Sequence, residues 1–202
     1  MRGQMTMDAA AYAALALSTV TSNLSGQDLG TVGMLTPGVY SFSSSAQLTG
    51  TLTLDAQGDP SALFVFLIGT ALTTASSSAV DVIHGGAGTG VYWLLGVTGG
   101  SGTGSATLGT GTAFAGNILA LDSISLVTRT TICGRALARN AAVTMDTNTV
   151  SDACGPAFNV GAGDFGSAGF AGNSVPEPGT VPLLCLGLLA LTLHGHSRKR
   201  GA

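Results

Sequence analysis

The segment TGTAFAGNILALDSISLVTRTTICGRALARN, residues 110–140, repeats itself after 18 positions. The shift aligns residues of similar kind: Thr110 with Thr128, Thr112 with Thr130, Phe114 with Ile132, Gly116 with Gly134 and Leu119 with Leu137. With one extra residue the series continues, because Thr128 then falls on Thr147 and Thr130 on Thr149. One coil of a β-solenoid has about this length, so the segment predicts stacked coils of short strands.

The composition agrees with such a fold. Of the 202 residues, 45% are hydrophobic, only 8% are charged, and 31 are glycine. This mixture is too apolar for a disordered chain, and its glycines lack the regular period of collagen. Aromatic residues make up only 5% of the chain, which suits the thin core of closely stacked coils. The length allows one domain with a sizeable core and a short appendage.

Short β-type runs separated by Gly, Ser, Thr and Asp fill the chain after Thr36. No helical pattern of adequate length lies between them, which excludes βαβ units and leaves barrels, sandwiches or solenoid coils. The repeat favours the solenoid, so we expect an all-β solenoid preceded by a short helix over Asp8–Leu17. The expected strands are Gly38–Phe42, Thr51–Asp55, Leu63–Ile68, Ala79–Ile83, Val91–Val97, Phe114–Leu119, Ser123–Val127, Thr131–Cys133 and Ala142–Met145.

Four segments follow from these patterns. Residues 1–35 hold the helix and its connection, and residues 36–153 form the β-solenoid. Residues 154–174 are rich in Gly and Ala and are expected to be a linker, and residues 175–202 form a distinct tail.

Several kinds of chemistry find no support in the sequence. The net charge is −3, and the few cations before the C-terminal basic cluster cannot neutralise a nucleic-acid backbone. His84 has no Ser or Cys in a nucleophile motif, and the glycine-rich stretches lack phosphate-binding patterns. The scattered aspartates are expected to cap turns, with a glycosidase-like carboxylate pair as the weaker alternative. We therefore expect no enzyme, no cofactor and no metal site.

The three cysteines show neither a CxxC motif nor a Cys/His cluster at metal-ligand spacing. Two interpretations stay open for Cys133 and Cys154. They form a disulfide if the protein is exported, or each is a small buried apolar residue.

Several motifs resemble the ice-binding-like family of microbial antifreeze and adhesion proteins over about residues 8–152. They are TPGVYSF from Thr36, QLTGTLTLDAQGD from Gln47, ATLGTGT from Ala106, FAGNILA from Phe114 and GRALARN from Gly134. The resemblance implies a right-handed, discontinuous parallel β-helix with three faces and one α-helix packed alongside. Family members usually carry a signal peptide and further coil sequence before the helix, so we expect the start of this chain to be truncated.

The tail resembles a PEP-CTERM sorting signal. Pro176, Glu177 and Pro178 match its motif, and an apolar run over Val181–Leu193 precedes a basic cluster at 198–200. The resemblance implies a hydrophobic sorting helix, processing by membrane machinery, and release or attachment at the cell surface after transient anchoring.

Pairs of threonines separated by one residue suggest a binding surface. On a strand, alternate side chains point to the same face, so each Thr-x-Thr would present two hydroxyls, and stacked coils would repeat them as a flat grid. Arg129 would then point inward or sideways. The candidates are Thr110, Thr112, Thr128, Thr130, Thr147, Thr149, Thr49 and Thr51, with Thr74 and Ser76 as weaker ones.

The family resemblance and this grid together imply a monomeric protein that adsorbs to ice. The alternative is a surface or matrix protein, such as an adhesin that binds extracellular polysaccharide, because a fold does not fix a function. Threonine is also a common strand residue on any exposed face, which is the simpler explanation of the motif.

Overall fold

The computed structural model describes residues 12–97, 103–152 and 165. In this part of the chain, short strands form three parallel sheets. Sheet A consists of β1 (Ser22–Asn23), β3 (Gly38–Phe42), β6 (Leu63–Ile68), β9 (Gly90–Leu95), β12 (Asn117–Ala120) and β15 (Ala136–Ala138). Sheet B consists of β4 (Ala46–Leu48), β7 (Ala71–Thr74), β10 (Ser105–Leu108), β13 (Ile124–Leu126) and β16 (Val143–Met145). Sheet C consists of β2 (Met34–Leu35), β5 (Thr51–Asp55), β8 (Ala79–Ile83), β11 (Ala113–Ala115), β14 (Thr131–Cys133) and β17 (Thr149–Ser151).

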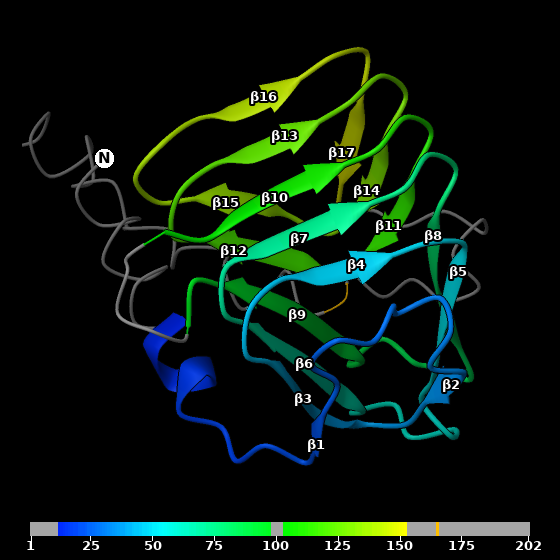
Figure 1. Cartoon of the computed structure of the whole chain (residues 1–202). Helices are drawn as coiled ribbons and strands as arrows, with labels where there is room; N and C mark the ends of the chain where they lie inside the picture. The colour runs from blue at the N-terminus through cyan, green and yellow to red at the C-terminus, as the bar shows by residue number, and fades with distance from the viewer. Residues whose placement is uncertain (1–11, 98–102, 153–164, 166–202) are drawn as a thin grey trace, which may run out of the picture. The chain divides into compact units, whose positions relative to one another are not determined.

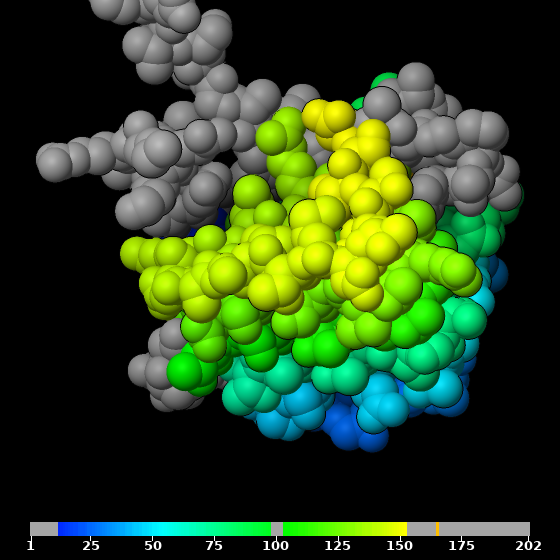
Figure 2. All heavy atoms as spheres, turned by 90° about the horizontal axis from the view of Figure 1, so that it is seen from above, coloured from blue at the N-terminus to red at the C-terminus, as the bar shows by residue number. Residues whose placement is uncertain are grey.

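The chain visits sheets A, B and C in turn, so three consecutive strands such as β6, β7 and β8 make one coil (Figure 1). In the first coil a single bridge between Asp28 and Gln47 stands where the other coils have a strand of sheet B. Seen from above, the last coil, in yellow, lies over the green and cyan coils (Figure 2). The prediction of a three-faced β-solenoid is confirmed.

The register confirms the repeat of 18 residues over most of its length. Phe114 pairs with Ile132, and Leu119 pairs with Leu137. The last coil differs from the prediction, because the partner of Thr149 is Thr131 rather than Thr130. The extra residue lies between β15 and β16. The next corner is one residue shorter, so the spacing between paired residues of β14 and β17 is 18 again.

Most strands expected from hydrophobic runs are present, but sheet B was largely missed. Its strands β4, β7 and β10 are short and polar on one side, which gives a weak signal. The single strand expected over Phe114–Leu119 is wrong. Gly116 has a φ of 110°, a conformation open mainly to glycine, and it turns the chain from β11 in sheet C to β12 in sheet A.

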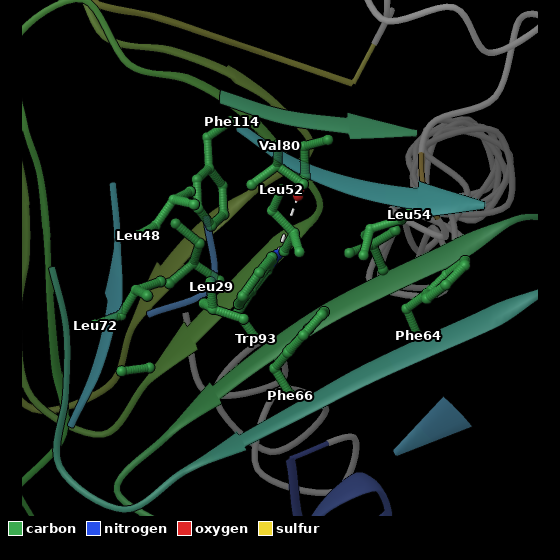
Figure 3. Packing of buried hydrophobic residues seen from close by; sticks show 14 of the residues in the cluster. Leu29, Leu48, Leu52, Leu54, Phe64, Phe66, Leu72, Val80, Trp93 and Phe114 are labelled. Atoms are coloured by element: carbon green, nitrogen blue, oxygen red, sulfur yellow. Dashed lines mark hydrogen bonds between the residues drawn. The ribbon is translucent and has the colours of Figure 1, made fainter. Parts of the chain in front are cut away.

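The core contains a stack of aromatic rings that crosses the coils. The ring of Phe66 lies 5.4 Å from that of Tyr40 and 3.9 Å from that of Trp93, and Trp93 lies 4.9 Å from Phe114. Leucines of the other sheets surround these rings, and the indole Nε1 of Trp93 donates a hydrogen bond to the carbonyl of Ala115 (Figure 3). Burying each of these large side chains contributes about 1.5–3 kcal/mol, so the stack ties three consecutive coils together.

A helical segment over residues 12–16 covers part of the outer face of sheet A. Its Tyr12 and Leu15 pack against Val65, Leu67 and Leu94, which point away from the solenoid core. This confirms the α-helix packed alongside the solenoid. The outer faces of sheets B and C are the ones that present exposed side chains along their strands.

The chain divides into two units, Met1–Phe170 and Ala171–Ala202, and all described residues belong to the first. Within them, no helix has both the length and the hydrophobicity needed to cross a bilayer. The predicted sorting helix lies outside the described residues. Cys133 is buried and disulfide-bonded, while Cys154, its predicted partner, lies outside the described residues.

Candidate functional site

The threonine motifs lie at the corner between sheets B and C rather than within strands. Gly111 and Arg129, the middle residues of two motifs, have left-handed φ values of 66° and 60°. The alternation of side chains along a strand does not apply at such a turn, so the two threonines of a motif point in different directions. Thr112 and Thr130 are completely buried, which contradicts their predicted place on an exposed surface. Arg129 was predicted to point inward or sideways, and its exposure excludes the inward direction.

The buried threonines close the corner with hydrogen bonds. The hydroxyl of Thr112 donates to the carbonyl of Gly109 at 2.7 Å, and that of Thr130 donates to the carbonyl of Val127 at 2.7 Å. The weaker candidate Thr74 is also buried and accepts a hydrogen bond from the N–H of Gly109. These hydroxyls satisfy buried backbone groups, so their role is structural.

The remaining predicted threonines divide between the B–C corner and sheet C. Thr49, Thr110, Thr128 and Thr147, together with Ser76, lie at the B–C corner, where the hydroxyl of Thr128 donates to Asp146. Thr51 and Thr149 are exposed on sheet C but lie far apart on it: Thr149 is on the end strand β17, and Thr51 is on β5, next to the strand at the other end. In register between them stand Ala79, Ala113 and Thr131.

A regular row of hydroxyl side chains occurs instead on the outer face of sheet B. In β4, β10 and β13 buried apolar residues alternate with outward ones, as in Ser105–Leu108, where Ala106 and Leu108 are buried. The outward residues at the centre of the strands stand in register from coil to coil. We call them the sheet B column: Gln47, Thr73, Thr107, Ser125 and Thr144. Neighbouring strands are about 4.7–4.9 Å apart, so the column has a fixed spacing.

The side chains around the sheet B column are small and uncharged. No charged residue occurs in β4, β7, β10, β13 or β16. Ala71 and Ser105, one outward position before Thr73 and Thr107, are in register with each other. The outer face of sheet B is therefore a strip of hydroxyl and methyl groups.

The hydroxyls of the column differ in their hydrogen bonds. Thr144 donates to the hydroxyl of Ser125 at 3.2 Å, and the amide of Gln47 donates to the hydroxyl of Thr49 at 3.4 Å. Among the described residues, neither Thr73 nor Thr107 uses its hydroxyl for a protein hydrogen bond. These two hydroxyls are free to bond to water.

The charged groups next to sheet B stand at its end and at the corners of the solenoid. Asp28 lies beside Gln47, the first residue of the sheet B column. Its Oδ1 accepts hydrogen bonds from the N–H groups of Thr49 and Gly30. Partial burial raises the pKa of Asp28, but the hydrogen bonds from Thr49 and Gly30 outweigh it and leave the pKa below its ordinary value. Sheet B therefore has a charged group beside its first strand and no charged residue within its strands, which sets one limit of the uncharged strip.

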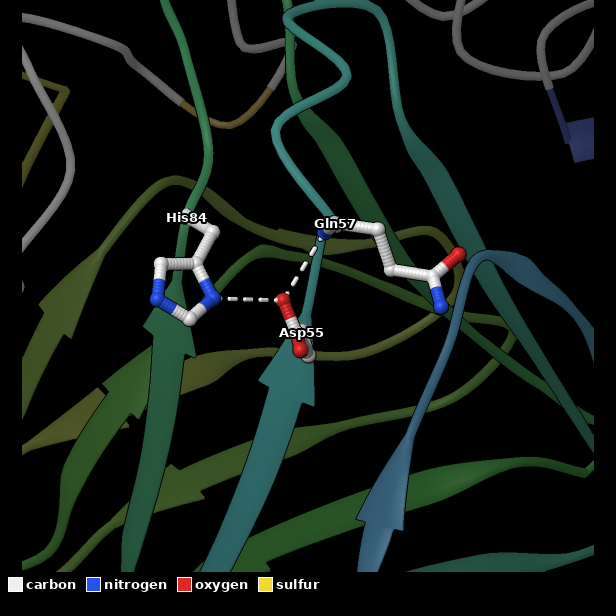
Figure 4. Close-up of polar contacts among 3 residues, drawn as sticks. All are labelled: Asp55, Gln57 and His84. Atoms are coloured by element: carbon white, nitrogen blue, oxygen red, sulfur yellow. Dashed lines mark hydrogen bonds and ion pairs between the residues drawn. The ribbon is translucent and has the colours of Figure 1, made fainter.

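A histidine–aspartate pair marks the corner between sheets C and A (Figure 4). The Oδ1 of Asp55 lies 2.8 Å from the N–H of Gln57 and 2.8 Å from the Nδ1 of His84. The hydrogen bond from Gln57, followed by that from His84, lowers the pKa of Asp55. The pair caps a turn, as expected for the scattered aspartates. The described residues contain no group of three or more His, Cys, Asp or Glu side chains placed to hold a metal.

The sequence did not predict the sheet B column, because its threonines occur at irregular intervals and outside the Thr-x-Thr motifs. Thr73 and Thr107 belong to ALTT and SATL, which share a pattern of small, apolar, Thr and then a buried residue. This four-residue pattern is the sequence signal by which Thr73 and Thr107 could have been predicted. It is a weak signal, because the sequence does not show which strands are in register.

Comparison with known proteins assigns the chain to a family. Residues 3–151 match the model described as Ice-binding-like, and residues 174–199 match the PEP-CTERM protein-sorting motif, as the resemblance of the tail predicted. The chain is 60% identical over 148 residues to an ice-binding protein of Nostoc sp. (strain HG1), covering 73% of this chain and 52% of that relative. It thus spans about half the length of this curated relative.

Solved structures give the same result. The crystal structure of an ice-binding protein from the Antarctic ascomycete Antarctomyces psychrotrophicus aligns with a TM-score of 0.63 at 34% identity, covering 73% of this chain and 68% of that one. An ice-binding protein from an Antarctic biological consortium aligns with a TM-score of 0.61 at 40% identity, covering 71% and 62%. Since the family model covers residues 3–151 and the three-faced parallel solenoid agrees with it, the chain belongs to the Ice-binding-like family.

Proposed function

We propose that this protein adsorbs to ice through the outer face of sheet B, and that it acts without catalysis. The observation that carries the proposal is the sheet B column, in which Thr73, Thr107, Ser125 and Thr144 stand in register on strands without charge. The proteins named above are ice-binding proteins by name, which supports the same activity for this chain.

The physical basis is a stiff surface that holds water in a regular pattern. Threonine is β-branched and has few χ1 rotamers, so its hydroxyl and methyl are fixed before binding. A surface that is already ordered loses little conformational entropy when it meets a crystal. The free hydroxyls of Thr73 and Thr107 can hold water, while the methyl groups keep the strip flat and apolar.

Nothing in the site or the comparisons supports the alternative of an adhesin without affinity for ice. The PEP-CTERM motif indicates export through a sorting system and a location outside the cell or at its surface. We propose further that the tail, around Pro176, Glu177 and Pro178, anchors the chain transiently in the membrane until the sorting machinery removes it. The protein is proposed to act as a monomer, with the ice surface as its partner.

The substitution Thr107→Tyr tests the proposal. The position is exposed on a strand, where tyrosine is well tolerated, so the fold should persist by circular dichroism. The ring would project from the strip and keep the neighbouring rungs away from ice, so inhibition of ice recrystallisation should be lost. Thr51→Tyr, at an exposed position of sheet C, is the matched control and should retain inhibition. Full activity of Thr107→Tyr would overturn the assignment to sheet B, and loss of activity in Thr51→Tyr alone would move it to sheet C.

A further inference from the structure

Each residue of the sheet B column forms one rung, and two of the five rungs are not threonine. Thr73, Thr107 and Thr144 are threonines, but Gln47 occupies the first rung and Ser125 the fourth. The inference drawn from this rests on the proposed function, because it concerns how strongly the same face engages ice.

At the first rung only the side chain departs from the pattern. Gln47 pairs in register with Thr73, and its carbonyl accepts a hydrogen bond from the N–H of Leu29, so its backbone belongs to the same ladder. Its side chain is long and exposed, and its amide donates to the hydroxyl of Thr49. A flexible amide must lose rotamer freedom to lie flat against a crystal, whereas a threonine is already fixed.

At the fourth rung a methyl group is missing. Ser125 lies in register between Thr107 and Thr144 but lacks the γ-methyl that both neighbours carry. Its hydroxyl also accepts the hydrogen bond from Thr144, so the O–H of Thr144 is directed to a neighbouring residue of the column rather than to water. The continuous run of matching, water-accessible rungs is therefore Thr73 and Thr107.

We propose that Gln47 and Ser125 limit the strength of ice adsorption, because they reduce a five-rung ladder to a run of two matching threonines. Gln47→Thr would lengthen the run at one end, and Ser125→Thr would join it to Thr144. The backbone register already accommodates both changes, and threonine is favoured in strands.

The experiment measures thermal hysteresis of the full chain and of Gln47→Thr, Ser125→Thr and the double variant at equal concentrations. Each single variant should raise hysteresis by about two-fold, and the double variant should exceed both, since each added rung adds a small increment of binding free energy. Gln47→Ala is the matched control, because it removes the amide without adding a hydroxyl and a methyl. It should show less than the gain of Gln47→Thr.

The outcomes separate the inference from the proposed function. Unchanged hysteresis in folded Gln47→Thr and Ser125→Thr, together with loss of activity in Thr107→Tyr, would overturn the inference and leave the ice-binding face in place. An equal gain in Gln47→Ala and Gln47→Thr would also overturn it, because the missing rung would then be irrelevant. Full activity of Thr107→Tyr would instead show that the outer face of sheet B does not bind ice, which would overturn the proposed function. Circular dichroism checks folding, and either single variant suffices if the other fails to fold.

Discussion

The hydroxyl oxygens of Thr74 and Thr112 lie 2.8 Å apart inside the corner between sheets B and C, although 38 positions separate the two residues. Thr74 accepts a hydrogen bond from the N–H of Gly109, and Thr112 donates to the carbonyl of Gly109. Thr74 must therefore be the donor to Thr112. The three residues form a closed ring of hydrogen bonds that joins β7 to the turn after β10, and the second threonine of the motif is a structural group.

Thr112→Val should destabilise the solenoid without removing ice binding. Valine has the shape of threonine but leaves the hydroxyl of Thr74 buried without an acceptor, which costs about 1–3 kcal/mol of unfolding free energy. Chemical denaturation measures this cost. Thr110→Val, at the exposed first position of the same motif, should stay within about 0.5 kcal/mol of the native chain. Equal stability of the two variants would show that the buried ring contributes nothing.

Gly134→Ala should be much more damaging than Gly111→Ala. Both glycines have positive φ, 136° and 66°, so alanine is strained at either position. A Cβ on Gly134 would lie 2.3 Å from the carbonyl oxygen of Gly116 in the coil below, whereas one on Gly111 would meet nothing closer than the hydroxyl of Ser77 at 3.8 Å. We expect a loss of about 1–2 kcal/mol for Gly111→Ala and a clearly larger loss for Gly134→Ala. Thermal unfolding followed by circular dichroism compares them, and equal melting temperatures would contradict the close contact between coils.

Tyr12 should make stability sensitive to alkaline pH. Its hydroxyl donates to the carbonyl of Leu95 at 3.0 Å, and burial raises the pKa of Tyr12 to about 12, with Arg139 opposing the shift. A raised pKa in the folded state means that this contribution to stability is complete below pH 10 and is lost as pH rises toward 12. The native chain should exceed Tyr12→Phe by about 0.5–1.5 kcal/mol at neutral pH, and the difference should vanish at high pH.

Melting temperatures measured from pH 7 to 11.5 follow this difference, and an absorbance titration should show one fewer late-ionising tyrosine in Tyr12→Phe. A difference that stayed constant across this range would mean that Tyr12 ionises as freely in the folded chain as in the unfolded one.

The fold could be predicted to a large extent from local patterns. Phe114 and Ile132, and likewise Leu119 and Leu137, occupy equivalent positions of the repeat, and the structure pairs them as neighbours. The prediction failed where a single residue changes the direction of the chain. Gly116 reads as part of an apolar strand in the sequence, but its positive φ ends one strand and begins another on a different sheet.

The sequence predicted the kind of surface, stacked hydroxyls on parallel coils, but not the residues that form it. Thr112 and Thr130 face the interior, and the exposed column runs through Thr73 and Thr107. Between these two threonines the chain makes a coil of unusual length, so no fixed period connects them in the sequence.

Local sequence patterns were enough to predict a β-solenoid with a sorting tail, because equivalent residues must stack when a short coil repeats, and because the PEP-CTERM motif is a linear signal. Which threonines face water could be learned only from the folded arrangement of the coils. At a corner the direction of a side chain depends on backbone angles such as those of Gly111 and Arg129, and on a sheet its neighbours depend on how coils of unequal length come into register.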